Sequence, residues 1–264
     1  MFSETETASE NLLRSYVDLL DEIQAIIQDS LYLNTRSLIL YGSYLLVRKG
    51  SKANIFIPGE SDLDLLLILD AGNEDSAEFL KRTTEIFNPI IFEPSYASIL
   101  DLTLLEVADF PIPIGASLNA LNLEAARRGA LLFGKNNVLE EFPYTNEQIR
   151  LAAMTQAYND WETMKTHFFH RDMIRGSEFF WMAVDSVLSS AHAFLAFNGR
   201  RDLVRLQVAN DIEQFLGDPY ANTVKRAHEL RFGSEIDNKT PFKFVLEAMI
   251  LLRHLYHRMK EIRT

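Results

Sequence analysis

The chain has 264 residues, of which 47% are hydrophobic and 24% charged. This composition is typical of a packed globular protein, and it excludes disordered, collagen-like and low-complexity architectures. Because there is no cysteine, a disulfide framework, a thiolate metal site and a cysteine nucleophile are also excluded. The net charge of −11 disfavours long nucleic acid as a partner, since binding to its phosphates needs clustered lysine and arginine.

The charge is unevenly distributed along the chain. Residues 1–144 contain 22 acidic and 10 basic residues, a net of −12, whereas residues 145–264 contain 15 acidic and 16 basic residues, a net of +1. This asymmetry indicates two units with different roles, the first suited to a metal ion or a cationic partner.

The N-terminal residues and the apolar stretches indicate the cellular location. Residues 1–10 are acidic and lack the basic-then-apolar order of a signal peptide. The longest apolar stretch considered as a membrane span, 244–252, is interrupted by Glu247 and is far shorter than the ~20 residues that a span needs. We therefore expect a cytoplasmic protein with no membrane partner.

The N-terminal half alternates helical and strand-like patterns, which indicates an α/β unit. In chain order, the predicted elements are a helix at 8–31, a strand at 37–41, a helix at 44–47, a loop or hairpin at 49–60, a strand at 63–69, a helix at 76–87, a strand at 97–107, a helix at 117–128 and a strand at 130–133.

The pattern changes at about residue 140, after which it is helical throughout. The predicted helices lie at 146–170, 176–197, 200–216, 222–231 and 241–263. We therefore predict two domains, 1–140 and 141–264.

Two aspartates open the apolar strand at 63–69. Asp62 and Asp64 are two residues apart, so in a strand their side chains leave the same face with Cα atoms ~6.5–7 Å apart. Unpaired carboxylates are costly to bury, and a divalent cation would relieve their repulsion. Two carboxylates together with phosphate oxygens are a ligand set that Mg²⁺ prefers.

A glycine–serine pair, Gly42-Ser43, follows the strand at 37–41 and precedes a predicted helix. Glycine lets the backbone approach a phosphate closely, and the helix start presents free N–H groups to which the Ser43 hydroxyl adds a donor. A third carboxylate, Asp101, lies within the strand at 97–107 and would complete the site as a metal ligand or as a base. Glu106, five residues on, points to the opposite face of a regular strand.

This order of motifs resembles the DNA polymerase β-type nucleotidyltransferase superfamily. A strand that ends in Gly-Ser, an Asp-x-Asp pair that opens the next strand and a lone acid in a later strand are its signature, here over residues 35–135. The helical half resembles the C-terminal domain of the aminoglycoside adenylyltransferase-like branch. One departure is the 18-residue interval between Ser43 and Asp62, longer than usual in the family, whose surplus is the segment 49–59.

The resemblance implies an α/β (α+β) nucleotidyltransferase domain with a small mixed sheet at 1–140, followed by an all-α helical bundle at 141–264 that binds a substrate or partner. It implies that Asp62 and Asp64 hold Mg²⁺, that Gly42 and Ser43 contact the nucleoside triphosphate, and that Asp101 is a metal ligand or the general base. The expected reaction is transfer of AMP from ATP to a hydroxyl of a small-molecule acceptor.

Several alternatives stay open. The acceptor could be a protein or an RNA end, as in antitoxin-like relatives, or the chain could be a non-catalytic nucleotide-binding module that keeps the fold. In the simplest structural interpretation, the three aspartates are merely solvated strand ends. A homodimer also stays open.

Acidic and aromatic residues lie close together on two successive predicted helices. Trp161 and Glu162 occur on one, and Glu178, Trp181 and Asp185 on the next. Coulomb attraction and cation–π contact would favour a cationic acceptor there. The alternative is that the tryptophans belong to the core and the acids are solvated.

Overall fold

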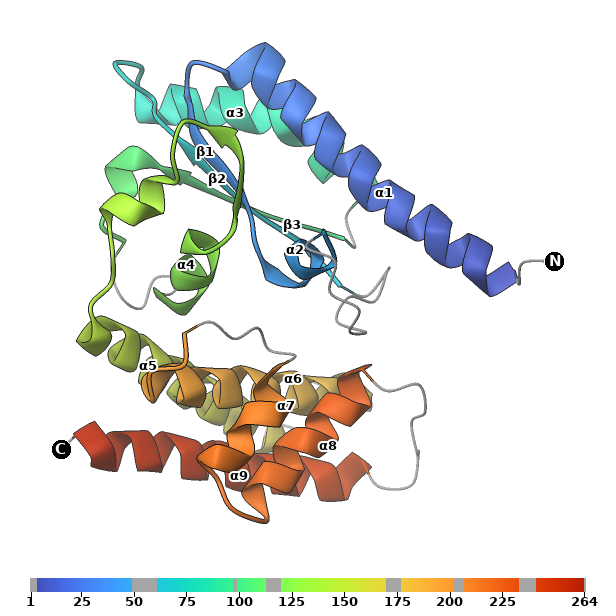
Figure 1. Cartoon of the computed structure of the whole chain (residues 1–264), viewed down its shortest axis with the longest axis vertical. Helices are drawn as coiled ribbons and strands as arrows, with labels where there is room; N and C mark the ends of the chain where they lie inside the picture. Colours follow the sequence, from blue (N-terminus) through green and yellow to red (C-terminus); the bar gives the residue numbers. More distant parts are fainter. Residues whose placement is uncertain are drawn as a thin grey trace. The chain divides into compact units, whose positions relative to one another are not determined.

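The computed structural model describes residues 4–48, 61–96, 99–112, 120–169, 177–201, 207–232 and 241–263 (Figure 1). The chain divides into two compact units. The first consists of Met1–Ile112 and Ala125–Pro143, and the second of Pro113–Glu124 and Tyr144–Thr264. Residues 113–124, which interrupt the first unit in the sequence, therefore belong to the second.

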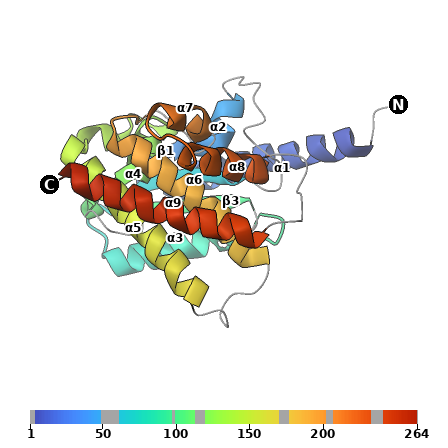
Figure 2. The same ribbon diagram turned by 90° about the horizontal axis from the view of Figure 1, so that it is seen from below.

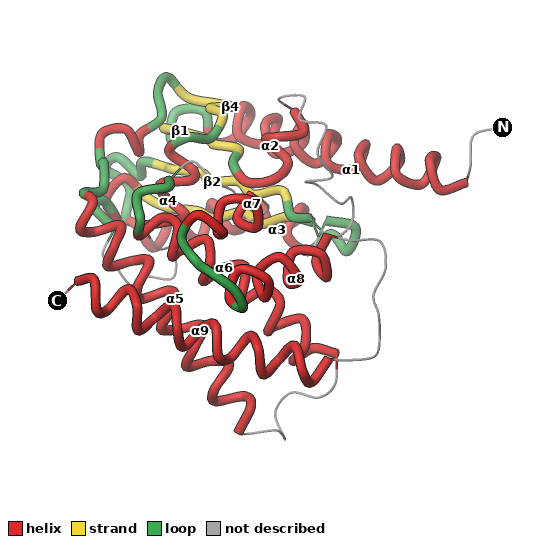
Figure 3. The backbone as a smooth tube through the Cα atoms, turned by 60° about the horizontal axis from the view of Figure 1, so that its bottom comes forward, coloured by secondary structure: helices red, strands yellow, loops and turns green. Residues whose placement is uncertain are grey.

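The first unit contains a four-stranded sheet, three of whose strands are labelled in Figure 3. Its strands are β1 (Thr35–Leu40), β2 (Leu63–Leu69), β3 (Leu100–Glu106) and β4 (Ala130–Gly134), in the order β3-β2-β1-β4. The central strand β1 is antiparallel to β2 and β4, whereas β2 and β3 are parallel. The small mixed sheet expected from the sequence is thus confirmed.

The main core of the first unit lies on one face of this sheet. Helices α1 (Glu4–Ile26) and α3 (Ser76–Ile91) pack there against alternate residues of β2, including Leu65 and Leu67 (Figure 1). Side chains alternate between the faces of a strand, so the even-numbered residues of β2 point to the opposite face. That opposite face carries Asp64, together with the buried Leu66.

The remaining helical segments of the first unit are short. A π-helical turn, Ile27–Leu31, continues α1, so that the helix predicted at 8–31 changes geometry near its end. Helix α2 (Gly42–Arg48) follows β1. Helix α4 (Ala120–Arg127), which precedes β4, is divided between the units after Glu124. Helix α3 begins at a cap in which the Asp75 carboxylate accepts hydrogen bonds from the N–H groups of Ala77 and Glu78.

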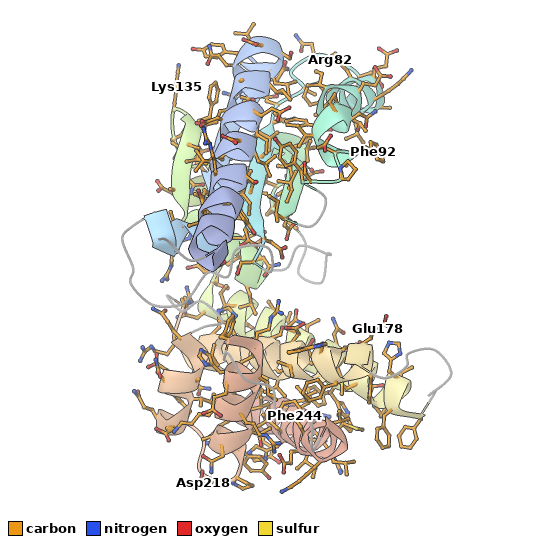
Figure 4. All side chains as sticks on the ribbon, turned by 90° about the vertical axis from the view of Figure 1, so that its right-hand side faces the viewer. Arg82, Phe92, Lys135, Glu178, Asp218 and Phe244 are labelled. Carbon is orange, nitrogen blue, oxygen red and sulfur yellow. The ribbon has the colours of Figure 1, made fainter. Side chains whose placement is uncertain are left out.

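The second unit is an all-α bundle. Its helices are α5 (Asn146–Phe169), α6 (Ser177–Phe197), α7 (Val208–Asp211), α8 (Tyr220–Phe232) and α9 (Pro241–Arg263). Helix α9 lies along α5 and α6, as Figure 2 shows. Large apolar side chains fill the interior, among them Phe194, Phe197 and Phe244, the last labelled in Figure 4.

The helix predicted over 200–216 is wrong in its length. The chain turns at Gly199, which has a positive φ of 92°, and the described part of this segment contains only α7 and a 3₁₀ turn, Ile212–Gln214. Ile212 and Leu216 are buried. Their spacing fits a helix, but it also fits a short turn whose apolar side chains pack onto the bundle.

The expectation about membrane segments also needs correction. Within the described residues, one helical segment, Glu178–Phe197, is long and apolar enough to cross a membrane, and it was not among the stretches considered from the sequence. Its most apolar part is 61% buried, and its residues form much of the core of the second unit. Such packing is typical of a core helix.

Candidate functional site

The candidate site begins where β1 ends. The Tyr41 N–H donates a hydrogen bond to the carbonyl oxygen of Asp64 at 3.1 Å, which extends the pairing of β1 with β2 by one residue. Gly42 follows with a positive φ of 71° and starts helix α2. The turn therefore brings the Gly-Ser pair of the sequence directly beside Asp64.

Asp64 and Asp101 are partners in the register of the parallel strands β2 and β3. Adjacent strands are ~4.8 Å apart and partners in register share a face, so the two carboxylates are neighbours. Asp101 is exposed, whereas Asp64 is partly buried. The structure thus brings together two acids that are 37 positions apart in the sequence.

Gly42 lies against the Asp64 side chain. A Cβ atom added to Gly42 would lie 1.9 Å from Asp64 Oδ2 and 2.7 Å from its Cγ. No side chain larger than hydrogen fits there unless Asp64 moves. Glycine is thus required both for the positive φ and for the close approach of the turn to a carboxylate.

Asp62 lies just before β2, not within the strand, and its side chain is exposed. The segment around it is anchored from both sides. The Tyr16 hydroxyl donates to the Ser61 carbonyl at 2.7 Å, and the Leu63 N–H donates to the Ile99 carbonyl at 2.6 Å. In the described part of the chain, no three acidic or histidine side chains meet as a metal-binding group, so Asp62 does not join Asp64 and Asp101 in one.

Ser43 is the second residue of α2 and is partly buried. It therefore lies one position beyond the glycine that contacts Asp64. Its predicted contact with a phosphate stays a prediction. The segment 49–59, expected to be a loop or hairpin near the site, lies outside the described residues.

Sequence reasoning missed Tyr41 and the part played by Thr103. Tyr41 is 8% exposed, and burial raises its pKa above the ordinary value, as do the nearby charges of Asp64 and Asp101. A hydrogen bond with the Thr103 side chain acts in the opposite direction. The net effect keeps the phenol protonated at neutral pH. The available signal was that Tyr41 directly precedes the Gly-Ser pair.

The acids predicted on the helical half belong to α5 and α6, and the structure shows basic neighbours for two of them. Glu162 accepts a hydrogen bond from Lys165 Nζ at 2.6 Å, and Lys165 also lies over the ring of Trp161 at 5.9 Å from its centroid. Asp185 Oδ1 lies 3.5 Å from Arg231 Nε.

The other residues predicted there differ in exposure. Glu178, near the start of α6, is exposed (Figure 4). Trp161 and Trp181 pack partly against the core of the bundle. Their roles in binding an acceptor stay predictions.

Among the comparisons with known proteins, one solved structure bears on the architecture. No family model and no curated protein matches the chain. Among solved structures, the chain is similar to spectinomycin adenyltransferase AAD(9) from Enterococcus faecialis, which was solved with ATP and spectinomycin. The TM-score is 0.60, and the sequences are 16% identical over 92% of this chain and 99% of that one. A nucleotidyltransferase-like protein from Exiguobacterium sibiricum gives a TM-score of 0.36 and 15% identity over 89% of this chain and 73% of that one, and we base no argument on it.

The mixed sheet and the helical bundle, together with this similarity, define the fold of a nucleotidyltransferase. Its particular form is aminoglycoside adenylyltransferase-like, a sheet-containing unit combined with a helical unit. At 16% identity the similarity shows the fold alone.

Proposed function

We propose that the chain transfers a nucleoside monophosphate, AMP from ATP, to a hydroxyl of a small-molecule acceptor in a Mg²⁺-dependent reaction. The observation that carries this proposal is the register pairing of Asp64 with Asp101 beside the Gly42 turn. The similar structure with ATP and spectinomycin supports a nucleoside triphosphate and a small-molecule acceptor as the substrates.

The donor groups present suit a magnesium ion. Mg²⁺ in phosphoryl-transfer sites is held by one or two carboxylates and by substrate phosphates, so Asp64 and Asp101 suffice without a third acid. Asp62, which is exposed just before β2 and does not group with this pair, would reach the ion only after its side chain reorients. When bound, the ion neutralises negative charge on the phosphate oxygens.

The proposed roles follow from the positions of the residues. Gly42 and Ser43 bind the triphosphate at the turn that follows β1, which the positive φ of Gly42 holds beside Asp64. The acceptor oxygen attacks the α-phosphorus, the bond from that phosphorus to the pyrophosphate oxygen breaks, and Asp101 takes the proton of the acceptor hydroxyl. Trp161, Glu162, Glu178 and Asp185 of the helical unit bind the acceptor.

A label-transfer assay tests the proposal. ATP labelled at the α-phosphate is incubated with the protein, Mg²⁺ and hydroxyl-bearing cationic sugars, with spectinomycin tested first. We expect label in a small molecule and a loss of at least about 100-fold in Asp101→Asn, in line with the removal of a general base. Asp29→Asn, which changes an exposed aspartate of the π-helical turn, is the matched control and should retain activity.

Other results would support other functions. Label that enters protein or RNA, and no small molecule, would favour the antitoxin-like alternative. A Mg²⁺-dependent thermal shift with a nucleotide, but no transfer to any acceptor, would favour a non-catalytic binding module. A nucleotide at 100 times its dissociation constant adds about 2.7 kcal/mol to stability, so binding is readily detected. No shift in wild type or in an Asp62→Asn, Asp64→Asn double variant would count against the nucleotide site itself.

A further inference from the structure

Helix α9 has an exposed stripe on the side opposite to the core of the second unit. The residues of α9 that face the core, which include Phe244, Leu251 and Leu255, are fully buried. The exposed residues recur at alternating intervals of four and three positions, the spacing of one face of a helix. We call the following residues the α9 stripe: Leu246, Ile250, Arg253, His257 and Lys260. Figure 2 shows α9 in front of α5 and α6 in the second unit.

The α9 stripe combines an apolar half with a basic half. Leu246 is 38% exposed and Ile250 is 60% exposed, and because they lie one turn apart they form a continuous apolar surface. Arg253 and Lys260 follow them, and within the described part of the chain neither one pairs with a carboxylate. An apolar surface bordered by charges of one sign fits a partner surface that is apolar in one part and acidic in another.

The first unit carries a surface of this complementary composition at the end of α3. Phe92, which is labelled in Figure 4, is 76% exposed and is followed by Glu93. The Tyr96 N–H donates to the Glu93 carbonyl at 2.9 Å, and the Tyr96 hydroxyl donates to the Glu22 carboxylate of α1 at 3.1 Å. Asp18 lies one turn before Glu22 on the same helix. We call the following residues the acidic patch: Asp18, Glu22, Ile91, Phe92 and Glu93.

The acidic patch has no basic neighbour of its own. Among the residues that the structure describes, no lysine or arginine pairs with Asp18, Glu22 or Glu93. The charge of the whole chain is divided in the same sense, since residues 1–144 have a net charge of −12 and residues 145–264 of +1. Opposite potentials steer two surfaces together, whereas surfaces of like charge repel. A second copy of the chain therefore offers the α9 stripe both an exposed aromatic side chain and a group of carboxylates.

We propose that the chain self-associates, with the α9 stripe of one copy docked on the acidic patch of a second copy. In this contact the apolar half of the stripe packs on Phe92, and Arg253 and Lys260 face the carboxylates. Each copy carries both surfaces, so two copies can form the contact twice about a two-fold axis. The proposal does not rest on nucleotidyl transfer, because none of these residues belongs to the candidate site.

The test is sedimentation velocity of the 264-residue chain over a range of concentrations, with variants that reverse the charge of one surface. Arg253→Glu combined with Lys260→Glu makes the α9 stripe acidic. Asp18→Lys combined with Glu93→Lys makes the acidic patch basic. Thermal unfolding verifies that each variant is folded at the temperature of the measurement.

A matched control separates this contact from a general effect of net charge. Lys81→Glu combined with Lys135→Glu changes the net charge by as much as the stripe variant does, but it alters exposed residues outside both surfaces. This control should associate as wild type does. If it weakens association as much as the stripe variant, the stripe is not the docking surface and the proposal is overturned.

We expect wild type to associate at low salt and its association constant to fall at least about 10-fold between ~0.05 M and ~0.5 M salt, because salt screens exposed charges. Each charge-reversed variant should associate at least about 10-fold more weakly than wild type, since like charges then face one another. An equimolar mixture of the two variants should regain association, because one has two acidic surfaces and the other two basic ones. Phe92→Ala should weaken association by about 10-fold, as expected for an aromatic residue at the centre of an interface.

Three results would overturn the proposal. The first is a wild type that is monomeric at every concentration at low salt, and the second is association that persists in both charge-reversed variants. The third uses anionic phospholipid vesicles as a probe. If the vesicles bind monomeric wild type but not the variant that combines Arg253→Glu with Lys260→Glu, the α9 stripe docks on a phosphate-bearing surface and not on a second copy. None of these results bears on the label-transfer assay, so the proposed function is tested separately.

Discussion

The two ends of β2 use the same residue types for opposite purposes. At one end, Asp64 lies beside the carboxylate of Asp101 and against the positive-φ Gly42. Just beyond the other end, Asp70 accepts a hydrogen bond from Arg36 Nε at 3.0 Å and another from the N–H of Gly72, also a positive-φ glycine, at 2.9 Å.

The difference lies in the charge of the neighbour. Asp70 and Arg36 tie the end of β2 to β1, which stabilises the sheet in the way that ion pairs and turn hydrogen bonds commonly do. Asp64 faces the like charge of Asp101, and this pairwise repulsion by itself costs stability. An acidic pair that opposes folding is a candidate for function, whereas an aspartate that is paired with arginine and caps a turn is explained by structure alone.

The largest expected effect is the loss of stability when the two positive-φ glycines, Gly42 and Gly72, are each replaced by alanine. Gly72→Ala should lose about 1–2 kcal/mol of unfolding free energy, the cost of a left-handed residue, because no atom lies within 4 Å of the added Cβ. Gly42→Ala bears the same cost and also displaces the Asp64 carboxylate, so it should lose about 1–3 kcal/mol more. Urea unfolding of the two variants measures the difference. Equal losses would show that the Asp64 side chain moves away from the added Cβ at no cost. Glycine would then be needed at position 42 only for its positive φ.

A smaller effect, the change in unfolding free energy when an aspartate is replaced by asparagine, should differ in sign between the two ends of β2. Asp101→Asn removes one of two like charges and should raise the unfolding free energy by up to about 1 kcal/mol at low salt. Asp70→Asn replaces a charged acceptor of three hydrogen bonds and should lower the unfolding free energy by about 1 kcal/mol. Denaturant unfolding in the absence of divalent cations measures both changes. A loss of stability in Asp101→Asn would remove the contrast between the two ends.

The smallest effect is a pH dependence. The hydrogen bond from Arg36, and then that from the Gly72 N–H, lowers the pKa of Asp70 in the folded protein. The stability supplied by Asp70 is therefore fully present above the pKa of an unfolded aspartate and is lost as the pH falls through the lower, folded pKa. The stability difference between wild type and Asp70→Asn should be constant at neutral pH and should shrink in acid. Asp29→Asn serves as the control, and a difference that persists in acid would contradict the assignment.

The local sequence pattern was sufficient to predict most of the helices and strands. The strand predicted at 63–69 coincides with β2, and the helix predicted to start at Ser76 does so because Asp75 caps it. Pattern failed at 200–216, where apolar spacing could not distinguish a long helix from a short turn packed on the bundle. It also paired Asp62 with Asp64 on one face of this strand, whereas β2 begins one residue after Asp62.

The site could be predicted only in part, for reasons of distance along the chain. The choice of Gly42, Asp64 and Asp101 as candidates came from residue type and local spacing. That Asp64 and Asp101 are register partners depends on β2 and β3 being parallel neighbours, which no local pattern specifies.

The sequence by itself determined the alternation of elements, the change from a sheet-forming half to a helical half and the identity of the candidate acids, since each follows from composition and periodicity over a few residues. The tertiary structure alone decided which acids meet, that Gly42 contacts Asp64 and that Asp185 has a basic neighbour on another helix. These are contacts between chain segments brought together by strand register and helix packing, and their energies depend on that placement and not on the residues taken one at a time.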